Sequence, residues 1–212
     1  RRRQRQMCIR DSVKGHPEAG FGGAIKNLGM GCVTKTTKRA IHAFSQPIVT
    51  SSCVGCGACV DFCPQHAISL QNGKAKINYA LCYGCGICIT KCPNRALQPK
   101  KGNLRVLLAN AAYAVLKKFS EKQMFINVLF DISPLCDCFP IGGTDPGFPV
   151  VKDIGITVST DCVSIDAASL YLVEKTAGRK VFYELHNIDP WEVVEAGHQF
   201  GLGEKDFRIV EV

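Results

Sequence analysis

Eight of the 13 cysteines stand in two copies of one spacing, Cys-x-x-Cys-x-x-Cys-x-x-x-Cys-Pro, and the copies begin at Cys53 and Cys82. Three thiolates so close together can point at three corners of one metal cluster if the chain wraps tightly around it. Glycine permits such wrapping because it adopts positive φ without strain. The glycines within the runs are Gly55, Gly57, Gly84 and Gly86. This spacing favours iron–sulfur chemistry, the transfer of single electrons.

The doubled run resembles the bacterial two-cluster ferredoxins, and the resemblance covers residues 50–99. In those ferredoxins the fourth cysteine of each run binds the other cluster. The resemblance therefore implies two [4Fe–4S] clusters with exchanged ligands. The first ligand set is Cys53, Cys56, Cys59 and Cys92, and the second is Cys82, Cys85, Cys88 and Cys63.

Zinc and disulfides are the other common uses of clustered cysteines. A structural zinc ion takes four ligands of its own, and two overlapping four-cysteine runs fit that pattern poorly. Disulfide frameworks belong to small secreted chains, whereas this chain has 212 residues. Thirteen cysteines in a cluster-binding protein instead predict a reducing cytoplasm, as in an anaerobe.

The composition is that of a globular protein, with 46% hydrophobic and 21% charged residues. No apolar run approaches the length of a membrane span. The net charge is +8, and residues 1–12 contribute +4 of it. Each cluster with its four thiolates is an anion, so we expect a nearly neutral holo-protein that binds neither nucleic acid nor a membrane.

Residues 1–12 have an unusual composition. Residues 5–12, Arg-Gln-Met-Cys-Ile-Arg-Asp-Ser, resemble the translation of a transposase end used in sequencing libraries. We therefore expect residues 1–12 to be a non-native segment, the native sequence to begin near Val13, and Cys8 to belong to no site. The native N-terminus then lies outside this sequence, so the absence of a signal peptide says nothing about localisation.

Three blocks follow residue 12. Residues 13–49 mix glycine, lysine and apolar residues, residues 50–99 hold the two cysteine runs, and residues 103–212 alternate between helical and strand patterns. Within the second block, Asn72-Gly73 lies between two short segments of alternating character. This dipeptide predicts a β-hairpin.

The third block predicts an α/β sheet. The expected elements are helices at 104–119, 163–177 and 190–200 and strands at 125–130, 154–158 and 207–212. Short apolar strands that alternate with helices form sheets covered on both faces. We therefore expect an N-terminally truncated α/β domain, made of the first and third blocks and interrupted by an inserted α+β two-cluster ferredoxin domain.

Most of the chain after residue 12 also resembles the iron–sulfur members of a family catalogued only as a domain of unknown function. The resembling stretches are residues 15–16, 23–32, 42, 131–138, 153–156, 161–168, 186–190 and 201–203. The resemblance implies that family's fold with a ferredoxin insert, but no settled activity. Cys162 stands where the family usually has proline, so we do not expect it to be a shared ligand.

The pair Cys136-x-Cys138 suggests a second place for chemistry. Together with Cys32 and either His16 or His42, these thiols have the ligand types of a third site that binds zinc, iron or nickel. Such a site requires blocks that are far apart in the sequence to converge. Buried cysteines are also common as small core residues, so both interpretations stay open.

Four more polar residues stand where α/β folds bind ligands. Lys26 and Asn27 follow a glycine-rich run whose backbone can face an anion, although a tight turn with a solvated lysine has the same pattern. Asp131 follows an expected strand and Asp166 lies early in an expected helix, where metals or substrates are bound. An N-cap or turn role is the commoner use of such aspartates.

These patterns predict a cytoplasmic electron-transfer protein whose two [4Fe–4S] clusters exchange single electrons with a redox partner protein. One alternative is a low-potential oxidoreductase, in which the α/β domain holds a small-molecule substrate or a third metal and the clusters supply electrons. Another is a structural or redox-sensing role for the clusters. The sequence shows no helix-turn-helix and no basic helix that could enter a DNA groove, so we do not expect direct DNA binding.

Overall fold

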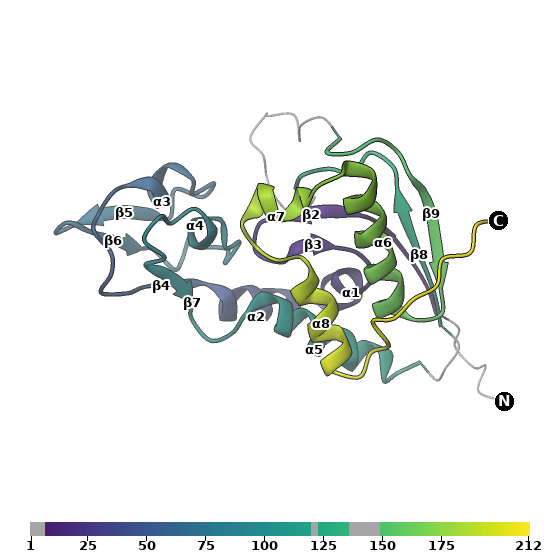
Figure 1. The fold of residues 1–212 in the computed structure, drawn as a ribbon. Coiled ribbons are helices and arrows are strands. Elements are labelled where there is room, and N and C mark those ends of the chain that lie inside the picture. Colours follow the sequence, from purple (N-terminus) through teal and green to yellow (C-terminus); the bar gives the residue numbers. More distant parts are fainter. Residues whose placement is uncertain (1–6, 120–122, 136–148) are drawn as a thin grey trace.

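The computed structural model describes residues 7–119, 123–135 and 149–212, and it is a mixed α/β structure with two lobes (Figure 1). We call residues 47–99 the cysteine lobe and the other described residues the α/β lobe. The elements of the α/β lobe are β1 (Met7–Ser12), β2 (Lys14–His16), β3 (Gly20–Gly22), α1 (Ala24–Lys26), the π-helical segment η1 (Asn27–Gly31), α2 (Lys35–Ser45), α5 (Leu104–Leu116), β8 (Gln123–Leu129), β9 (Gly155–Ser159), α6 (Cys162–Ala177), α7 (Val181–His186) and α8 (Trp191–Gln199). Those of the cysteine lobe are β4 (Pro47–Val49), α3 (Ala58–Asp61), β5 (Ile68–Gln71), β6 (Lys74–Ile77), α4 (Ile87–Thr90) and β7 (Leu97–Pro99).

The main sheet of the α/β lobe has the strand order β1-β8-β9. β1 is parallel to β8 and β9 is antiparallel to it. Phe125, Asn127 and Leu129 of β8 alternate towards the buried face, which α6 covers. On the opposite face, Ile156 is 58% exposed and Val158 is 60% exposed, so the prediction of a sheet covered on both faces is wrong for these strands.

β1 falls within the segment that we expect to be non-native. Its backbone continues the sheet, with Met7 paired to Gln123 and Ser12 paired to Val128. The origin of residues 1–12 remains an expectation.

The expected helices of the third block are confirmed with small shifts at their ends. α6 begins after Asp161, whose Oδ1 accepts hydrogen bonds from Val163 N at 2.7 Å and Ser164 N at 2.9 Å. It ends at Gly178, where φ is +67°. α5 ends at Leu116 instead of residue 119. After it, the backbone N–H groups of Lys118 and Phe119 donate to the carbonyl oxygens three residues earlier, as in a 3₁₀ turn.

The expected strand at residues 207–212 does not form. This C-terminal segment has no regular secondary structure and is exposed along its whole length. With β9 and α6 it lines a surface groove, in which its apolar side chains gain little burial. A strand needs ladder hydrogen bonds and a buried face for stability, and this segment has neither.

None of the described helices is long and apolar enough to cross a membrane.

The cysteine lobe is attached to the α/β lobe through a two-stranded stem. β4 and β7 pair antiparallel, with Pro47 opposite Pro99, so the chain enters and leaves the lobe side by side (Figure 1). The predicted hairpin is confirmed: β5 and β6 pair around Asn72 and Gly73, which have φ of +50° and +70°. The lobe has its own hydrophobic cluster, built around Ile68, Ala75, Ile77 and Leu97 together with several of its cysteines.

Candidate metal centres

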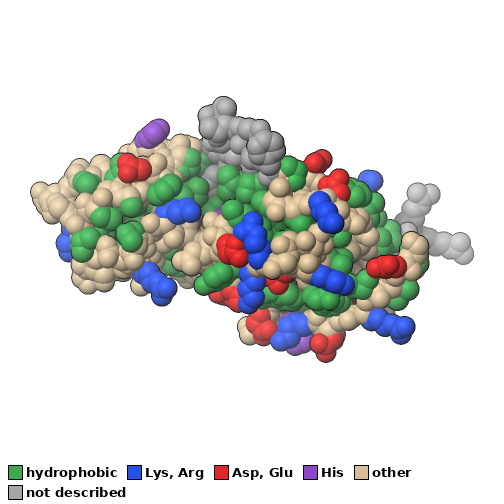
Figure 2. Space-filling view, turned by 45° about the horizontal axis from the view of Figure 1, so that its top comes forward, with side chains coloured by type: hydrophobic (Ala, Val, Ile, Leu, Met, Phe, Trp, Pro, Cys, Tyr) green, Lys and Arg blue, Asp and Glu red, His purple; other side chains and the backbone are tan. Residues whose placement is uncertain are grey.

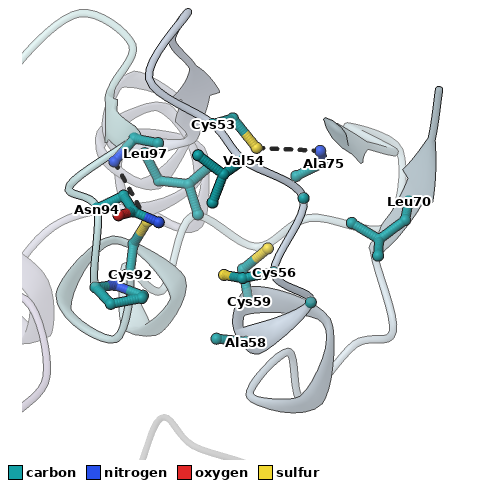
Figure 3. A pocket seen from close by; sticks show the side chains of 14 residues that line it. Cys53, Val54, Cys56, Ala58, Cys59, Leu70, Ala75, Cys92, Asn94 and Leu97 are labelled. Atoms are coloured by element: carbon teal, nitrogen blue, oxygen red, sulfur yellow. Dashed lines mark hydrogen bonds between the residues drawn. The ribbon is translucent and has the colours of Figure 1, made fainter. Parts of the chain in front are cut away.

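The four cysteines of the first predicted ligand set line one pocket of the cysteine lobe, which we call the first pocket (Figure 3). Cys53, Cys56 and Cys59 come from the loop and helix α3, and Cys92 reaches the same pocket from beyond α4. The pocket holds about 330 Å³ of space, part of it open to solvent. Two segments far apart in the sequence thus meet around one hollow.

A second pocket of about 330 Å³ is lined by the other four cysteines. Cys82, Cys85 and Cys88 surround it from the loop and helix α4, and Cys63 joins them from beyond α3. The fourth cysteine of each run therefore lies in the pocket of the other run. This is the division implied by the resemblance to two-cluster ferredoxins.

Backbone N–H groups donate to three of the cysteine sulfurs. Ala75 N lies 3.4 Å from Cys53 Sγ, as the dashed line in Figure 3 marks. The other two bonds occur at equivalent positions of the two cysteine runs. Ala67 N donates to Cys63 Sγ at 3.2 Å, and Ala96 N donates to Cys92 Sγ at 3.3 Å. Such bonds favour the anionic sulfur that a metal ligand requires.

Four thiolates around one hollow are the ligand types of an iron–sulfur cluster. Among the residues that the structure describes, no three or more His, Cys, Asp or Glu side chains are grouped closely enough to hold one metal ion. Zinc requires its four ligands at about 2.0–2.3 Å from one point, whereas these sulfurs are spread around a hollow. A [4Fe–4S] cube, in which each thiolate binds a different iron, suits this arrangement.

The two pockets differ in their surroundings. In the first pocket Cys56 is exposed, and backbone hydrogen bonds from Ala75 and Gly55 lower the pKa of Cys53. In the second pocket, burial raises the pKa of Cys85 to about 11 and raises that of Cys88 as well. Positive iron in the second pocket would compensate the cost of these buried thiolates, so binding there is coupled to release of protons.

The second pocket lies against the α/β lobe. A Cβ atom on Gly84 would collide with the backbone oxygen of His42, and one on Gly86 would lie 2.6 Å from Oε2 of Glu18. Gln46 adds a bridge, because its Nε2 donates to Cys82 O at 2.8 Å. The loop around the second pocket thus packs on the α/β lobe, whereas the first pocket has the exposed cysteine Cys56.

Glu18 is a buried acid that sequence reasoning did not single out. It is 4% exposed, and its Oε2 has no hydrogen-bond partner. Burial raises the pKa of Glu18 from 4.5 to about 8, although the charge of Arg105 opposes this shift. A protonated Glu18 favours folding, so its contribution to stability is full below pH 4.5 and is lost as the pH rises to about 8.

The Glu18→Gln variant tests this effect. The amide stays neutral, so the free energy of unfolding should fall less in the variant than in the parent between about pH 6 and about pH 8.5. Urea titrations of the helical circular dichroism at each pH, kept anaerobic, measure the difference. Glu184→Gln, at an exposed ion pair with Arg179, is the control and should follow the parent curve. Parallel curves for the parent and Glu18→Gln would contradict the expected burial effect.

Two residues of the suggested second site lie near each other. His16 is 3% exposed, and its Nδ1 accepts hydrogen bonds from Glu18 N at 3.1 Å and Ala19 N at 3.0 Å. Burial lowers the pKa of His16 well below its usual value, and the nearby charge of Lys26 acts in the same direction. Lys26 itself is 8% exposed. Through Nδ1, His16 holds the turn between β2 and β3.

Of the remaining residues of that suggested site, Asn27 and Cys32 lie close together, because Cys32 N donates to Asn27 O at 3.0 Å. Asn27 donates from Nδ2 to Arg10 O at 3.0 Å, and Cys32 is exposed at the end of η1. Asp131 has φ of +46° in an exposed turn after β8. Cys136 and Cys138 lie outside the described residues, so the third metal site remains a prediction.

Asp166 is fully buried and holds the start of α1. Its Oδ1 accepts hydrogen bonds from Ala24 N at 2.7 Å and Asn127 Nδ2 at 2.9 Å, and its Oδ2 accepts one from Ile25 N at 2.9 Å. Burial raises its pKa to about 7, although these donors oppose the shift. Asn127 also donates to Ser169 Oγ at 3.1 Å. These contacts favour a structural role for Asp166 over a ligand role.

Comparisons with known proteins give one family and one relative. The family model described as "Domain of unknown function (DUF362)" matches residues 11–171. Ferredoxin-2 of Desulfomicrobium norvegicum is 50% identical to the chain over 32 residues, which are 15% of this chain and 54% of that ferredoxin. The chain thus spans about half the length of this curated relative.

Proposed function

Because this chain belongs to the DUF362 family, whose function is unknown, we propose a function from its own residues: it binds two [4Fe–4S] clusters and transfers single electrons in the cytoplasm. The observation that carries the proposal is the division of eight cysteines between two pockets, four to each. The similarity to a ferredoxin supports an iron–sulfur role. The side-by-side ends of the cysteine lobe support its interpretation as an inserted two-cluster ferredoxin domain.

Within this proposal, the chain holds the clusters and sets their surroundings. The clusters, when bound, supply one-electron chemistry. The backbone N–H groups of Ala67, Ala75 and Ala96 donate to ligand sulfurs and favour the more negative, reduced state. The exposed first pocket suits exchange with a partner protein, and the second pocket suits transfer towards the α/β lobe.

The experiment that tests the proposal is a count of iron and sulfide in protein purified without oxygen. Two cubes require about eight iron and about eight sulfide per chain, and reduction should give the EPR signals of [4Fe–4S]⁺ centres. Zinc in place of iron, or iron without sulfide, would refute it. Metal analysis of the same sample gives a direct reading of any third metal.

A second candidate is an oxidoreductase in which the α/β lobe holds a substrate or a third metal. The contact of the second pocket with buried Glu18 favours it, because electrons leaving that pocket would enter the α/β lobe. A further metal that is lost from Cys136→Ser and Cys138→Ser variants would support this candidate. A chain that holds only cluster iron, with the same content in both variants, would argue against the metal-site version.

A further inference from the structure

The positive charge of the chain is concentrated around the cysteine lobe. Residues 35–101 hold nine basic side chains and one acidic side chain, Asp61, so this segment carries the whole net charge of +8. The rest of the sequence is neutral when taken together, with 17 basic and 17 acidic residues, because acidic residues elsewhere offset the +4 of residues 1–12. Figure 2 shows the same contrast, with basic side chains spread over the lobe at the left and both signs interspersed over the lobe at the right.

Among the described residues, no ion pair involves these basic side chains. The ion pairs found among the described residues all lie outside residues 35–101, as between Arg105 and Glu192 or Lys205 and Glu195. Within the segment, lysines lie over aromatic rings instead, as Lys91 does over Phe62 at 5.7 Å. A surface of one sign without internal partners attracts molecules of the opposite sign and steers their approach.

Three basic residues are neighbours in the chain of residues that line the first pocket, and we call Lys74, Lys91 and Arg95 the basic rim. All three are exposed.

Apolar side chains complete the mouth of the same pocket. Val54 is 67% exposed and Leu70 is 46% exposed, and both line the pocket (Figure 3). An exposed apolar centre within a charged rim is the arrangement of a protein-binding surface. The second pocket also has exposed apolar side chains at Phe62 and Tyr83, but its loop packs against the α/β lobe at Gly84 and Gly86.

We propose that an acidic electron-carrier protein docks over the first pocket, with its carboxylates against the basic rim and an apolar contact at Val54 and Leu70. The inference rests on the proposed function, since it concerns the partner of the cluster in that pocket. Bound clusters add negative charge inside the lobe, but the groups that a partner meets at the surface are the rim side chains. Charge complementarity of this kind speeds association and fixes orientation.

The test measures binding of a fluorescently labelled acidic flavodoxin to the cluster-loaded chain by anisotropy. The dissociation constant should rise steeply with sodium chloride. The triple variant Lys74→Glu, Lys91→Glu, Arg95→Glu should bind about tenfold or more weakly at low salt, and the difference should shrink at high salt. The matched control Lys175→Glu, Lys180→Glu, Arg208→Glu changes the net charge equally in the α/β lobe, at exposed positions. It should bind within about threefold of the parent.

The outcomes separate this inference from the proposed function. Iron content and EPR signals of both triple variants should equal those of the parent. If the parent holds both clusters and the two triple variants bind the flavodoxin equally well, the docking inference is wrong and the proposed function stands. A parent without clusters refutes the proposed function, whatever the anisotropy shows. Tighter binding of a labelled DNA duplex than of flavodoxin, weakened by the basic-rim variant, would assign the surface to nucleic acid and overturn the inference.

Discussion

Replacing Cys63 by alanine is expected to remove the same cluster as replacing Cys85, although Cys63 belongs to the other cysteine run. Both residues line the second pocket, and alanine offers no ligand in place of the thiolate. Cys92→Ala should likewise match Cys56→Ala, because both cysteines line the first pocket. Each variant should lose about four of about eight iron atoms, unless the damaged lobe loses both clusters.

Iron and sulfide counts with EPR spectra of the remaining centre measure this prediction. The four variants should fall into two spectral pairs that follow the pockets and not the runs. Cys162→Ala is the control, since Cys162 is buried in α6 of the α/β lobe and should leave the iron content unchanged. If Cys63→Ala instead gave the spectrum of Cys56→Ala, the exchange of ligands would be disproved. If a single alanine variant loses both clusters, the comparison uses Cys63→Ser and Cys92→Ser instead. The serine oxygen can still bind iron, so these variants can retain a cluster with an altered spectrum.

Asp166→Ala should destabilise the α/β lobe by about 3 kcal/mol. The change leaves the N–H groups of Ala24 and Ile25 buried without an acceptor, and it also removes a partner of Asn127. Asp166→Asn should be destabilising as well, because its amide would direct a donor at one of the same N–H groups. Urea unfolding followed by helical circular dichroism measures both effects.

The control for this loss is Asp161→Ala at the start of α6. Asp161 also accepts from backbone N–H groups, but it is only half-buried, so water can replace its bonds. Its loss should cost about 1 kcal/mol, as is usual for a helix N-cap. Equal effects at the two positions would show that burial of the Asp166 contacts adds nothing to their strength.

The cysteine lobe could be predicted from sequence because its determinants are local. The spacing of the two runs and the Asn72-Gly73 turn act within a few residues, and the structure shows the hairpin and two four-cysteine pockets. In the α/β lobe, α5, β8, β9, α6 and α8 were also predictable, since each is amphipathic or apolar over its own length, whereas α2 and α7 were not predicted. The ligand roles of the cysteines remain predictions.

The parts that sequence could not supply arise from distant contacts. Glu18 is buried because residues of the cysteine lobe, Gly86 among them, close over it. Asn127 appears in an apolar strand, yet it takes part in a polar network with Asp166. Residues 207–212 have the apolar pattern of a strand, but no other part of the chain buries them, and the pattern alone could not show this.

The stem of the cysteine lobe brings the two ends of the lobe together. Strands β4 and β7 run side by side, and just below them Lys100 N donates to Gln46 O at 2.8 Å. The two ends of the α/β lobe therefore already meet beneath the stem, so the chain beyond the stem could be removed without leaving a gap between them.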